Sequence, residues 1–295
     1  MRGHPLFGVA LATAGVLLLT PDAMLMRLSG MAGFQMLGWR GLLMGAVLVS
    51  AWVLSSRHYR DDLARLGSFH GVMIILCQFF NAMLFCVGIA IAPVAVVLFG
   101  VATAPVFAAI FTWLLIGEPT RRATWITIAA VMGGIAVAVF GGHQGAGAVN
   151  MAALWGALAG LGVAAALALN FTVMRAQPQL PILLVIGVGA LFAGVAGTLI
   201  TGPGAMFDGT VWAMATTALV ILPASFFSLS LASRHTHASN VSLLLLLETV
   251  LGPFWVWLVI GEAATPAMIM GGAIVVCSLA AYLLLSERRR ALRRI

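Results

Sequence analysis

The stretch that most limits how this chain can fold is the apolar run Val241–Glu262, VSLLLLLETVLGPFWVWLVIGE. It is long enough to cross a bilayer, and it carries one carboxylate, Glu248, near its middle. The earlier run Val97–Glu118, VLFGVATAPVFAAIFTWLLIGE, is similar: when the Gly-Glu pairs that end both runs are aligned, Trp113 falls on Trp257. Two such copies, both too apolar for water, indicate a membrane protein that arose by duplication.

The composition supports the same class of protein. Of the 295 residues, 62% are hydrophobic and 8% are charged, whereas roughly a quarter of the residues of a soluble domain are charged. The apolar runs are continuous rather than alternating, which favours helices over a transmembrane β-barrel. We therefore predict an all-α integral membrane protein with ten transmembrane helices, at residues 5–26, 33–55, 68–91, 93–116, 123–141, 151–174, 181–201, 210–232, 239–260 and 266–286.

Arginine supplies every basic side chain, and the formal net charge is +7. With the N-terminus inside, the outer segments hold only Arg27, and Arg40 falls within the second span. This asymmetry predicts a multi-pass membrane protein with both termini inside, N-in and C-in, and the arginines mark the cytoplasmic rim rather than a nucleic-acid partner. The arginines of the inner segments are Arg2, Arg57, Arg60, Arg65, Arg121, Arg122, Arg175, Arg234, Arg288, Arg289, Arg290, Arg293 and Arg294.

The repeat extends beyond these two runs. Gly8–Arg27 aligns without a gap on Gly156–Arg175, with a shift of 148 residues, against 144 at the Gly-Glu pairs. We therefore predict two repeats of five helices each, residues 1–146 and 147–295. Because five is odd, the second repeat must insert upside down, which gives inverted-topology repeats. Such proteins usually bind substrate near the midplane where the repeats meet, and move one half against the other to give alternating access.

The motifs in the two matching runs also carry a family resemblance. Ala104-Pro105-Val106-Phe107 leads to the first Gly-Glu pair, Leu247-Glu248-Thr249-Val250 leads to the second, and Arg40 stands in the second span. On these residues the chain resembles the EamA-type branch of the drug/metabolite transporter superfamily. Among its members it looks most like the YddG-type bacterial amino-acid exporters. The resemblance implies a secondary transporter of the bacterial inner (plasma) membrane, with a cavity formed mainly by spans 3, 4, 8 and 9.

Glu248 is the most informative single residue. A carboxylate deep in a span costs roughly 2.5–3.5 kcal/mol on insertion scales, so we expect it to face the interior of the bundle. Burial would let it bind and release protons near neutral pH. Glu248 is therefore a candidate for contacting a substrate amine or for proton coupling. The alternative is a structural carboxylate that accepts hydrogen bonds from neighbours such as Ser242.

Three side chains of the third span share one helical face. Gln78, Asn81 and Phe85 stand at i, i+3 and i+7. Amides in lipid need polar partners, so this face is expected either to line a cavity or to join two helices. Because an amide can donate to a carboxylate and accept from an ammonium, a zwitterionic amino acid would suit a cavity with this lining.

Two further spans contribute candidates for substrate binding. Phe99 and Thr103 repeat at i and i+4 in the fourth span, where packing in the core is the competing interpretation. In the eighth span Ser225 and Phe226 follow Pro223, whose ring frees a carbonyl within the membrane. The serine could satisfy that carbonyl or contact a substrate.

Several charged or polar residues have simpler explanations. Asp22 and its repeat partner Asn170 could mark the two mouths of a pathway or could be polar helix ends. Glu118 and Glu262 each precede a helix, where the helix dipole favours a carboxylate, so we expect structural roles. Arg40 is expected to contact backbone carbonyls or lipid head groups.

The remaining patterns exclude several classes of function. The sequence contains no P-loop, no Gly-x-Ser-x-Gly motif and no histidines at metal-ligand spacing, so we expect no enzyme activity, catalytic residue, cofactor or metal site. We predict a secondary transporter that exports aromatic or neutral amino acids and related small metabolites. Its partners would be that substrate and the lipid bilayer, and it could act as a monomer. The alternatives are a multidrug or other-metabolite exporter and an integral membrane enzyme acting on lipids.

Overall fold

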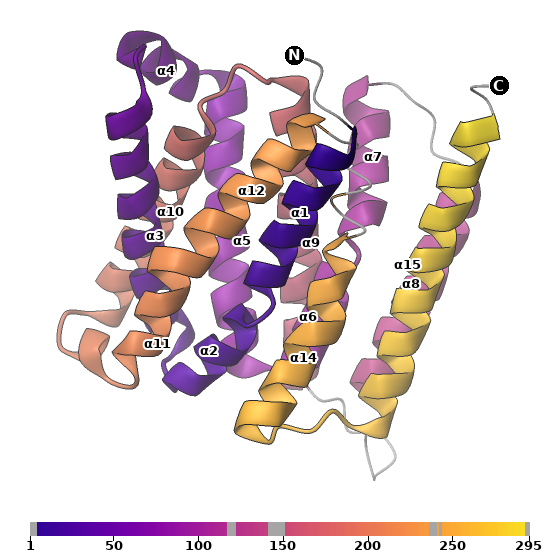
Figure 1. Cartoon of the computed structure of the whole chain (residues 1–295). Coiled ribbons are helices and arrows are strands. Elements are labelled where there is room, and N and C mark those ends of the chain that lie inside the picture. Colours follow the sequence, from indigo (N-terminus) through magenta and orange to yellow (C-terminus); the bar gives the residue numbers. More distant parts are fainter. Residues whose placement is uncertain (1–4, 117–121, 141–150, 236–240, 242–243, 293–295) are drawn as a thin grey trace.

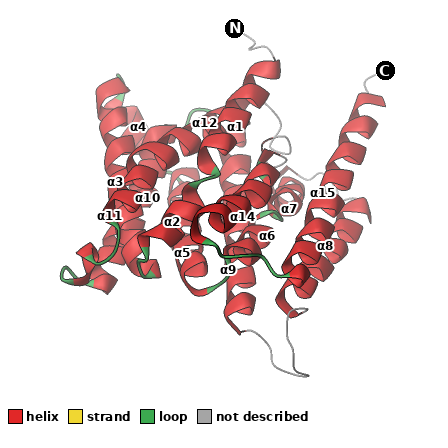
Figure 2. Cartoon of the chain, turned by 60° about the horizontal axis from the view of Figure 1, so that its bottom comes forward, coloured by secondary structure: helices red, strands yellow, loops and turns green. Residues whose placement is uncertain are grey.

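The computed structural model describes residues 5–116, 122–140, 151–235, 241 and 244–292. In this part of the chain all regular structure is helical and there is no strand (Figures 1 and 2), which confirms the all-α prediction. The elements are α1 (Pro5–Leu19), α2 (Asp22–Ser29), α3 (Gly33–Ser55), α4 (Tyr59–Leu66), α5 (Phe69–Ile91), α6 (Val94–Val101), α7 (Ala104–Ile116), α8 (Arg122–Phe140), α9 (Met151–Ala176), α10 (Ile182–Thr201), η1 (Ala205–Phe207), α11 (Val211–Thr216), η2 (Thr217–Ile221), α12 (Leu222–His235), α14 (Leu246–Ile260) and α15 (Pro266–Leu292).

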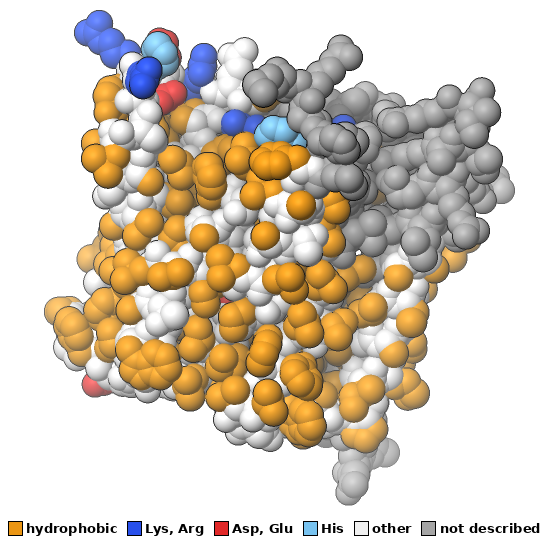
Figure 3. Space-filling view, viewed as in Figure 1, with side chains coloured by type: hydrophobic (Ala, Val, Ile, Leu, Met, Phe, Trp, Pro, Cys, Tyr) orange, Lys and Arg blue, Asp and Glu red, His pale blue; other side chains and the backbone are white. Residues whose placement is uncertain are grey.

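Seven segments of the described chain are long and apolar enough to cross a membrane. They are Phe7–Ser29, Gly33–Ser55, Phe69–Ile91, Val94–Leu115, Met151–Ala176, Ile182–Thr201 and Val211–His235. Shorter apolar helices at Ala129–Ala138, Leu246–Ile260 and Pro266–Ser278 fall within the other three predicted spans. Hydrophobic side chains cover much of the face shown in Figure 3, and the coloured basic side chains gather at one end. The chain is a multi-pass membrane protein.

Two of the segments contain a break in the helix. Thr20 and Pro21 separate α1 from α2, because proline cannot donate to the preceding turn. Ala102 and Thr103 separate α6 from α7, and the Thr103 hydroxyl donates to the carbonyl of Gly100 over 2.7 Å. The predicted fourth span, residues 93–116, is therefore two helices rather than one.

Helices α3 and α10 approach each other closely because glycines line both sides of their contact. A methyl group added at Gly41 would overlap the backbone of Gly194, and one added at Gly45 would lie 2.8 Å from the carbonyl oxygen of Gly187. Small residues allow helix backbones to approach in this way within a membrane. The most extensive helix pairs are α3 with α10, α5 with α9, α8 with α15, and α1 with α12. Helices α8 and α15 lie side by side at one edge of the bundle (Figures 1 and 2).

Side-chain contacts identify the two ends of the bundle. At the α4 end, Arg65 and Arg234 donate to carbonyls of segment 177–180, which follows α9, over 2.9 and 2.6 Å. The Phe7 ring, near the start of α1, contacts the His235 ring there with 5.5 Å between centroids. The start of α1 and the end of α9 therefore lie at the same end of the bundle.

At the opposite end of the bundle, near the C-terminus of α2, Arg27 contacts two segments that are far from it in the sequence. Its Nη2 donates to the carbonyl of Ala92 over 2.8 Å, and its Nε lies 3.0 Å from Oε2 of Glu262. A methyl group added at Gly156, near the start of α9, would overlap the side chain of Ala92. Helix α9 thus begins at the α2 end and runs in the direction opposite to α1.

Candidate functional site

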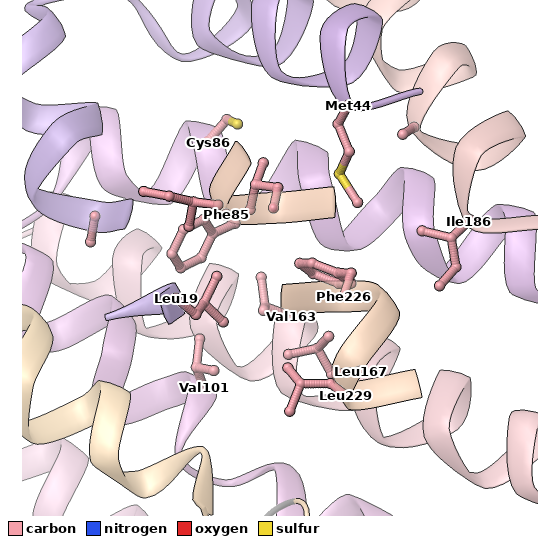
Figure 4. Close-up of a cluster of buried hydrophobic side chains, with 14 of the residues drawn as sticks. Leu19, Met44, Phe85, Cys86, Val101, Val163, Leu167, Ile186, Phe226 and Leu229 are labelled. Carbon is pink, nitrogen blue, oxygen red and sulfur yellow. The ribbon is translucent and has the colours of Figure 1, made fainter. Parts of the chain in front are cut away.

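A buried cavity lies at the centre of the bundle, where helices from the first and second halves of the chain meet. Its volume is about 40 Å³. A water molecule needs at least about 10–15 Å³ on such a measure, so the cavity takes a few waters in this conformation. Figure 4 shows part of its apolar wall. The lining residues are Leu19, Asp22, Arg40, Gly41, Met44, Gln78, Asn81, Ala82, Phe85, Val101, Val163, Leu167, Ala190, Leu222, Phe226 and Glu248.

An ion pair between Asp22 and Arg40 forms one side of this cavity. Asp22 is the first residue of α2, where the helix dipole stabilises a carboxylate. Nη1 of Arg40 donates to both carboxylate oxygens of Asp22, over 2.6 and 2.7 Å. The Asp22 side chain is 1% exposed and the Arg40 side chain is 7% exposed. Both charges are therefore withdrawn from solvent, and each depends on the other for compensation.

Met26 and Phe85 also contact the Arg40 guanidinium. The sulfur of Met26 lies 2.8 Å from Nη1, and the ring of Phe85 lies 5.5 Å from the guanidinium carbon. A cation within about 6 Å of a ring centroid is attracted by the ring quadrupole. Phe85 therefore holds the guanidinium against α5 while Asp22 holds it against α2.

Glu248 lines the cavity from the second half of the chain. It stands in the first turn of α14 and is 5% exposed. Among the described residues its carboxylate accepts no hydrogen bond and forms no ion pair. Ser242, the partner considered from the sequence, lies outside the described residues. The buried Glu248 carboxylate is thus free to contact what enters the cavity.

The predicted polar face of α5 lies on the same cavity. Gln78, Asn81 and Phe85 all belong to its lining. Oε1 of Gln78 is fully buried and has no hydrogen-bond partner among the described residues. Buried acceptors are normally paired, so this oxygen is a candidate contact for a molecule in the cavity.

The other predicted binding residues divide between the cavity and its surroundings. Phe226 lines it, whereas the ring of Phe99 packs against Gly272 of α15. Thr103, in the break between α6 and α7, donates to the Gly100 carbonyl of α6. Ser225 is buried with an unpartnered hydroxyl outside the lining. A substrate role for Phe99, Thr103 and Ser225 stays a prediction.

The structure places Asp22 and Arg40 in contacts that the sequence analysis did not predict. We expected Arg40 to contact carbonyls or head groups and Asp22 to mark a mouth or a helix end, but they form a pair at the cavity. The sequence does place one anion, Asp22, and one cation, Arg40, in consecutive spans. Charges in lipid usually pair with one another, so this pattern could have predicted the ion pair. The cavity also draws on α2, α3, α9 and α10, beyond the four spans expected, while span 4 supplies only Val101.

Two acidic residues away from the cavity have structural partners. Asp62 accepts hydrogen bonds from Trp52 Nε1 and Ser56 Oγ, over 2.8 and 2.7 Å, which fastens α4 to the end of α3. Glu262 pairs with Arg27 as described above and accepts weakly from the amide of Val94, over 3.4 Å. Its partners are those of a structural carboxylate. Glu118 lies outside the described residues.

Fold and site together define a class: an all-helical, multi-pass membrane protein with a charged cavity between its two halves. Residues 6–140, somewhat under half of the chain, match the sequence profile of the EamA-like transporter family. A solved structure, titled only "Crystal structure of protein", matches with a TM-score of 0.67 at 19% identity, over 94% of this chain and 98% of that chain. At that identity the match shows a shared fold. No curated protein matches the sequence.

Proposed function

We propose that this chain is an EamA-type secondary transporter that moves small metabolites across the membrane by alternating access. The observation that carries the proposal is a charged cavity enclosed by helices of both halves. The family match over residues 6–140 supports the transporter class. We further propose amino-acid export, with aromatic or neutral amino acids as substrates, as in the YddG-type exporters that the sequence resembles.

The packing of the helices supports two equivalent halves, residues 1–146 and 147–295, and ten spans in all. If α1–α2 corresponds to α9, α3 to α10, α5 to α11–α12, α6–α7 to α14, and α8 to α15, the four most extensive contacts become symmetric. The pair α5 with α9 maps onto α12 with α1. The pairs α3 with α10 and α8 with α15 map onto themselves. A pseudo-two-fold axis between the halves would produce this pattern.

The directions of the helices support an inverted repeat. Helix α1 runs from the α4 end to the α2 end, and its counterpart α9 runs the other way. The breaks also correspond, because α7 begins at Ala104 and α14 begins at Leu246, within two residues of the shift of 144. Inverted repeats with interrupted helices at the midplane are the architecture on which many secondary transporters rely.

The lining supports a small molecule with both apolar and charged parts. Phe85 and Phe226 offer aromatic surface, Gln78 and Asn81 offer amides, and Glu248 offers a carboxylate. A cavity of about 40 Å³ is smaller than the roughly 150 Å³ that holds benzene in an engineered protein. Substrate entry therefore requires the halves to move apart. A mostly apolar lining also suits a multidrug exporter, which is the second candidate.

The positions of the arginines support a topology with both termini inside the bacterial inner membrane. Arg65 and Arg234 lie at the α4 end, and the start of α1 and the C-terminal end of α15 lie at that end as well (Figure 1). Arginine is enriched on the cytoplasmic side of inner-membrane proteins. We therefore place the α4 end in the cytoplasm and the Arg27–Glu262 pair on the outer side.

The test is uptake of labelled amino acids into proteoliposomes that contain the purified full chain, with and without an imposed pH gradient. We expect saturable uptake above that of empty liposomes. Folded protein that takes up none of the amino acids, while exporting cationic dyes, would replace the amino-acid assignment with multidrug export. Absence of any transport would overturn the transporter class.

A further inference from the structure

We infer that Arg40 anchors the carboxylate of the substrate, so that the cavity recognises a zwitterion held between α3 and α14. This inference rests on the proposed transport function and specifies the chemistry of the transported molecule. It gives a substrate-binding role to Arg40, for which the sequence predicted a structural contact. It gives a positioning role to Asp22, for which the sequence left open a pathway mouth or a polar helix end.

Arg40 has more hydrogen-bond donors than its protein partners use. A guanidinium has five N–H donors, of which two are on Nη1. Both oxygens of Asp22 and the sulfur of Met26 are met by Nη1 alone. Among the described residues Nε and Nη2 donate to no acceptor, which leaves three N–H groups of a charged side chain without a protein partner.

The side chain that carries these donors lines the cavity. Arg40 is 6% exposed and lines the cavity. Nε and Nη2 are not among the described side-chain atoms that are fully buried without a partner, so they reach open space, and Arg40 lines the cavity. A molecule in the cavity can therefore accept from these N–H groups, and hydrogen bonds to a charged donor are among the stronger ones. A planar edge formed by Nε and Nη2 matches the two oxygens of a carboxylate, which is the bidentate pairing that guanidinium favours. The chemical class of ligand is therefore a carboxylate.

Acceptors on α14 and α5 are suited to the other end of the ligand. Glu248 reaches the same cavity from α14 and forms no direct ion pair with a described residue, and Oε1 of Gln78 is a buried acceptor without a donor. Both are suited to an ammonium group. Because the direct ion pair of Arg40 is with Asp22, an ammonium group in the cavity would give Glu248 a cation in direct contact. A zwitterion supplies an anion to Arg40 and a cation to Glu248.

The experiment compares ligands that differ at one end only. In proteoliposomes, uptake of labelled phenylalanine is challenged with unlabelled phenylalanine, phenylalaninamide (no carboxylate) and 3-phenylpropionate (no amine). We expect each analogue to compete at least about tenfold more weakly than phenylalanine, which corresponds to one good charged contact. Saturable phenylalanine uptake that phenylalaninamide inhibits equally well would overturn the role of Arg40 and leave the transport function intact.

Substitutions at Asp22 and Arg40 then test whether Arg40 causes the preference for phenylalanine over its amide. Asp22→Asn with Arg40→Gln removes both charges together, and in it the preference for phenylalanine over its amide should disappear. Arg40→Lys keeps the charge and should retain part of the preference. Arg27→Gln, an arginine away from the cavity, is the matched control and should leave the preference unchanged. A double variant that is folded and still prefers phenylalanine over its amide would refute the proposal.

A second readout does not depend on transport. The melting temperature of the detergent-purified protein is measured with each of the three ligands, since a ligand stabilises the state that it binds. Phenylalanine should raise it more than the amide does, and only while Arg40 is present. No uptake together with this pattern would remove the transport function but keep the site. No uptake and no ligand-dependent shift would remove both.

Discussion

The pair formed by Asp22 and Arg40 should behave as a coupled unit in stability measurements. We consider Asp22→Asn, Arg40→Met and the two together. The carboxylate is 1% exposed and the guanidinium side chain 7% exposed, and their bonds are 2.6 and 2.7 Å long. Removing one partner of such a pair leaves an uncompensated buried charge and costs about 3–5 kcal/mol of unfolding free energy. Removing both partners eliminates that charge, so the double variant should be more stable than either single variant.

The assay is reversible unfolding of the purified protein in one detergent, followed by tryptophan fluorescence, for the wild type and all three variants. The four free energies form a double-mutant cycle, in which residues in direct contact show coupling energies of about 0.5–3 kcal/mol or more. We expect a coupling near the upper end, because no water-exposed surface screens this pair. A double variant whose loss equals the sum of the two single losses would show that the charges do not depend on each other, and would refute the reasoning.

Three further changes test other parts of the structure. Gly41→Ala should lower the unfolding free energy by about 1–3 kcal/mol, because the added methyl group overlaps α10. Gly133→Ala should leave the unfolding free energy nearly unchanged, because no atom lies within 4 Å of a methyl group added there. Arg27→Glu should slow uptake by repelling Glu262, and adding Glu262→Arg should restore it; no rescue would mean that the pair does not join the halves. Glu248→Gln should abolish any effect of a pH gradient on uptake, and unchanged rates and pH dependence would remove Glu248 from the mechanism.

The helical class and the positions of most helices followed from the sequence, because long apolar runs in lipid leave the backbone few alternatives. The polar face of α5 was also accessible, since Gln78, Asn81 and Phe85 are separated by helical spacing and all reach the cavity. The cost of burying an amide in lipid and the helical spacing both predict that these side chains share a face turned away from lipid.

The neighbours of a side chain could not be obtained in that way. Periodicity shows which residues share a face but not which helix that face meets. Phe99 therefore fitted a cavity as well as a core, and it packs against Gly272. The pairing of Asp22 with Arg40 is associated with the break at Thr20 and Pro21, which makes Asp22 the first residue of α2. Helix breaks of this kind depend on tertiary packing around the freed backbone groups and not only on the proline itself.

Under the proposed two-fold relation, α3 with α10 and α8 with α15 are the contacts that map onto themselves, so both must lie close to the axis. The backbones of α3 and α10 touch through Gly41 and Gly194, which leaves little freedom for these helices to slide. The pairs α1 with α12 and α5 with α9 exchange places under the same relation. A rocking motion that loosens one of these pairs would tighten the other. Since Arg40 and Gly41 line the cavity beside the fixed α3–α10 contact, the carboxylate anchor would stay in place while Glu248 moves with α14.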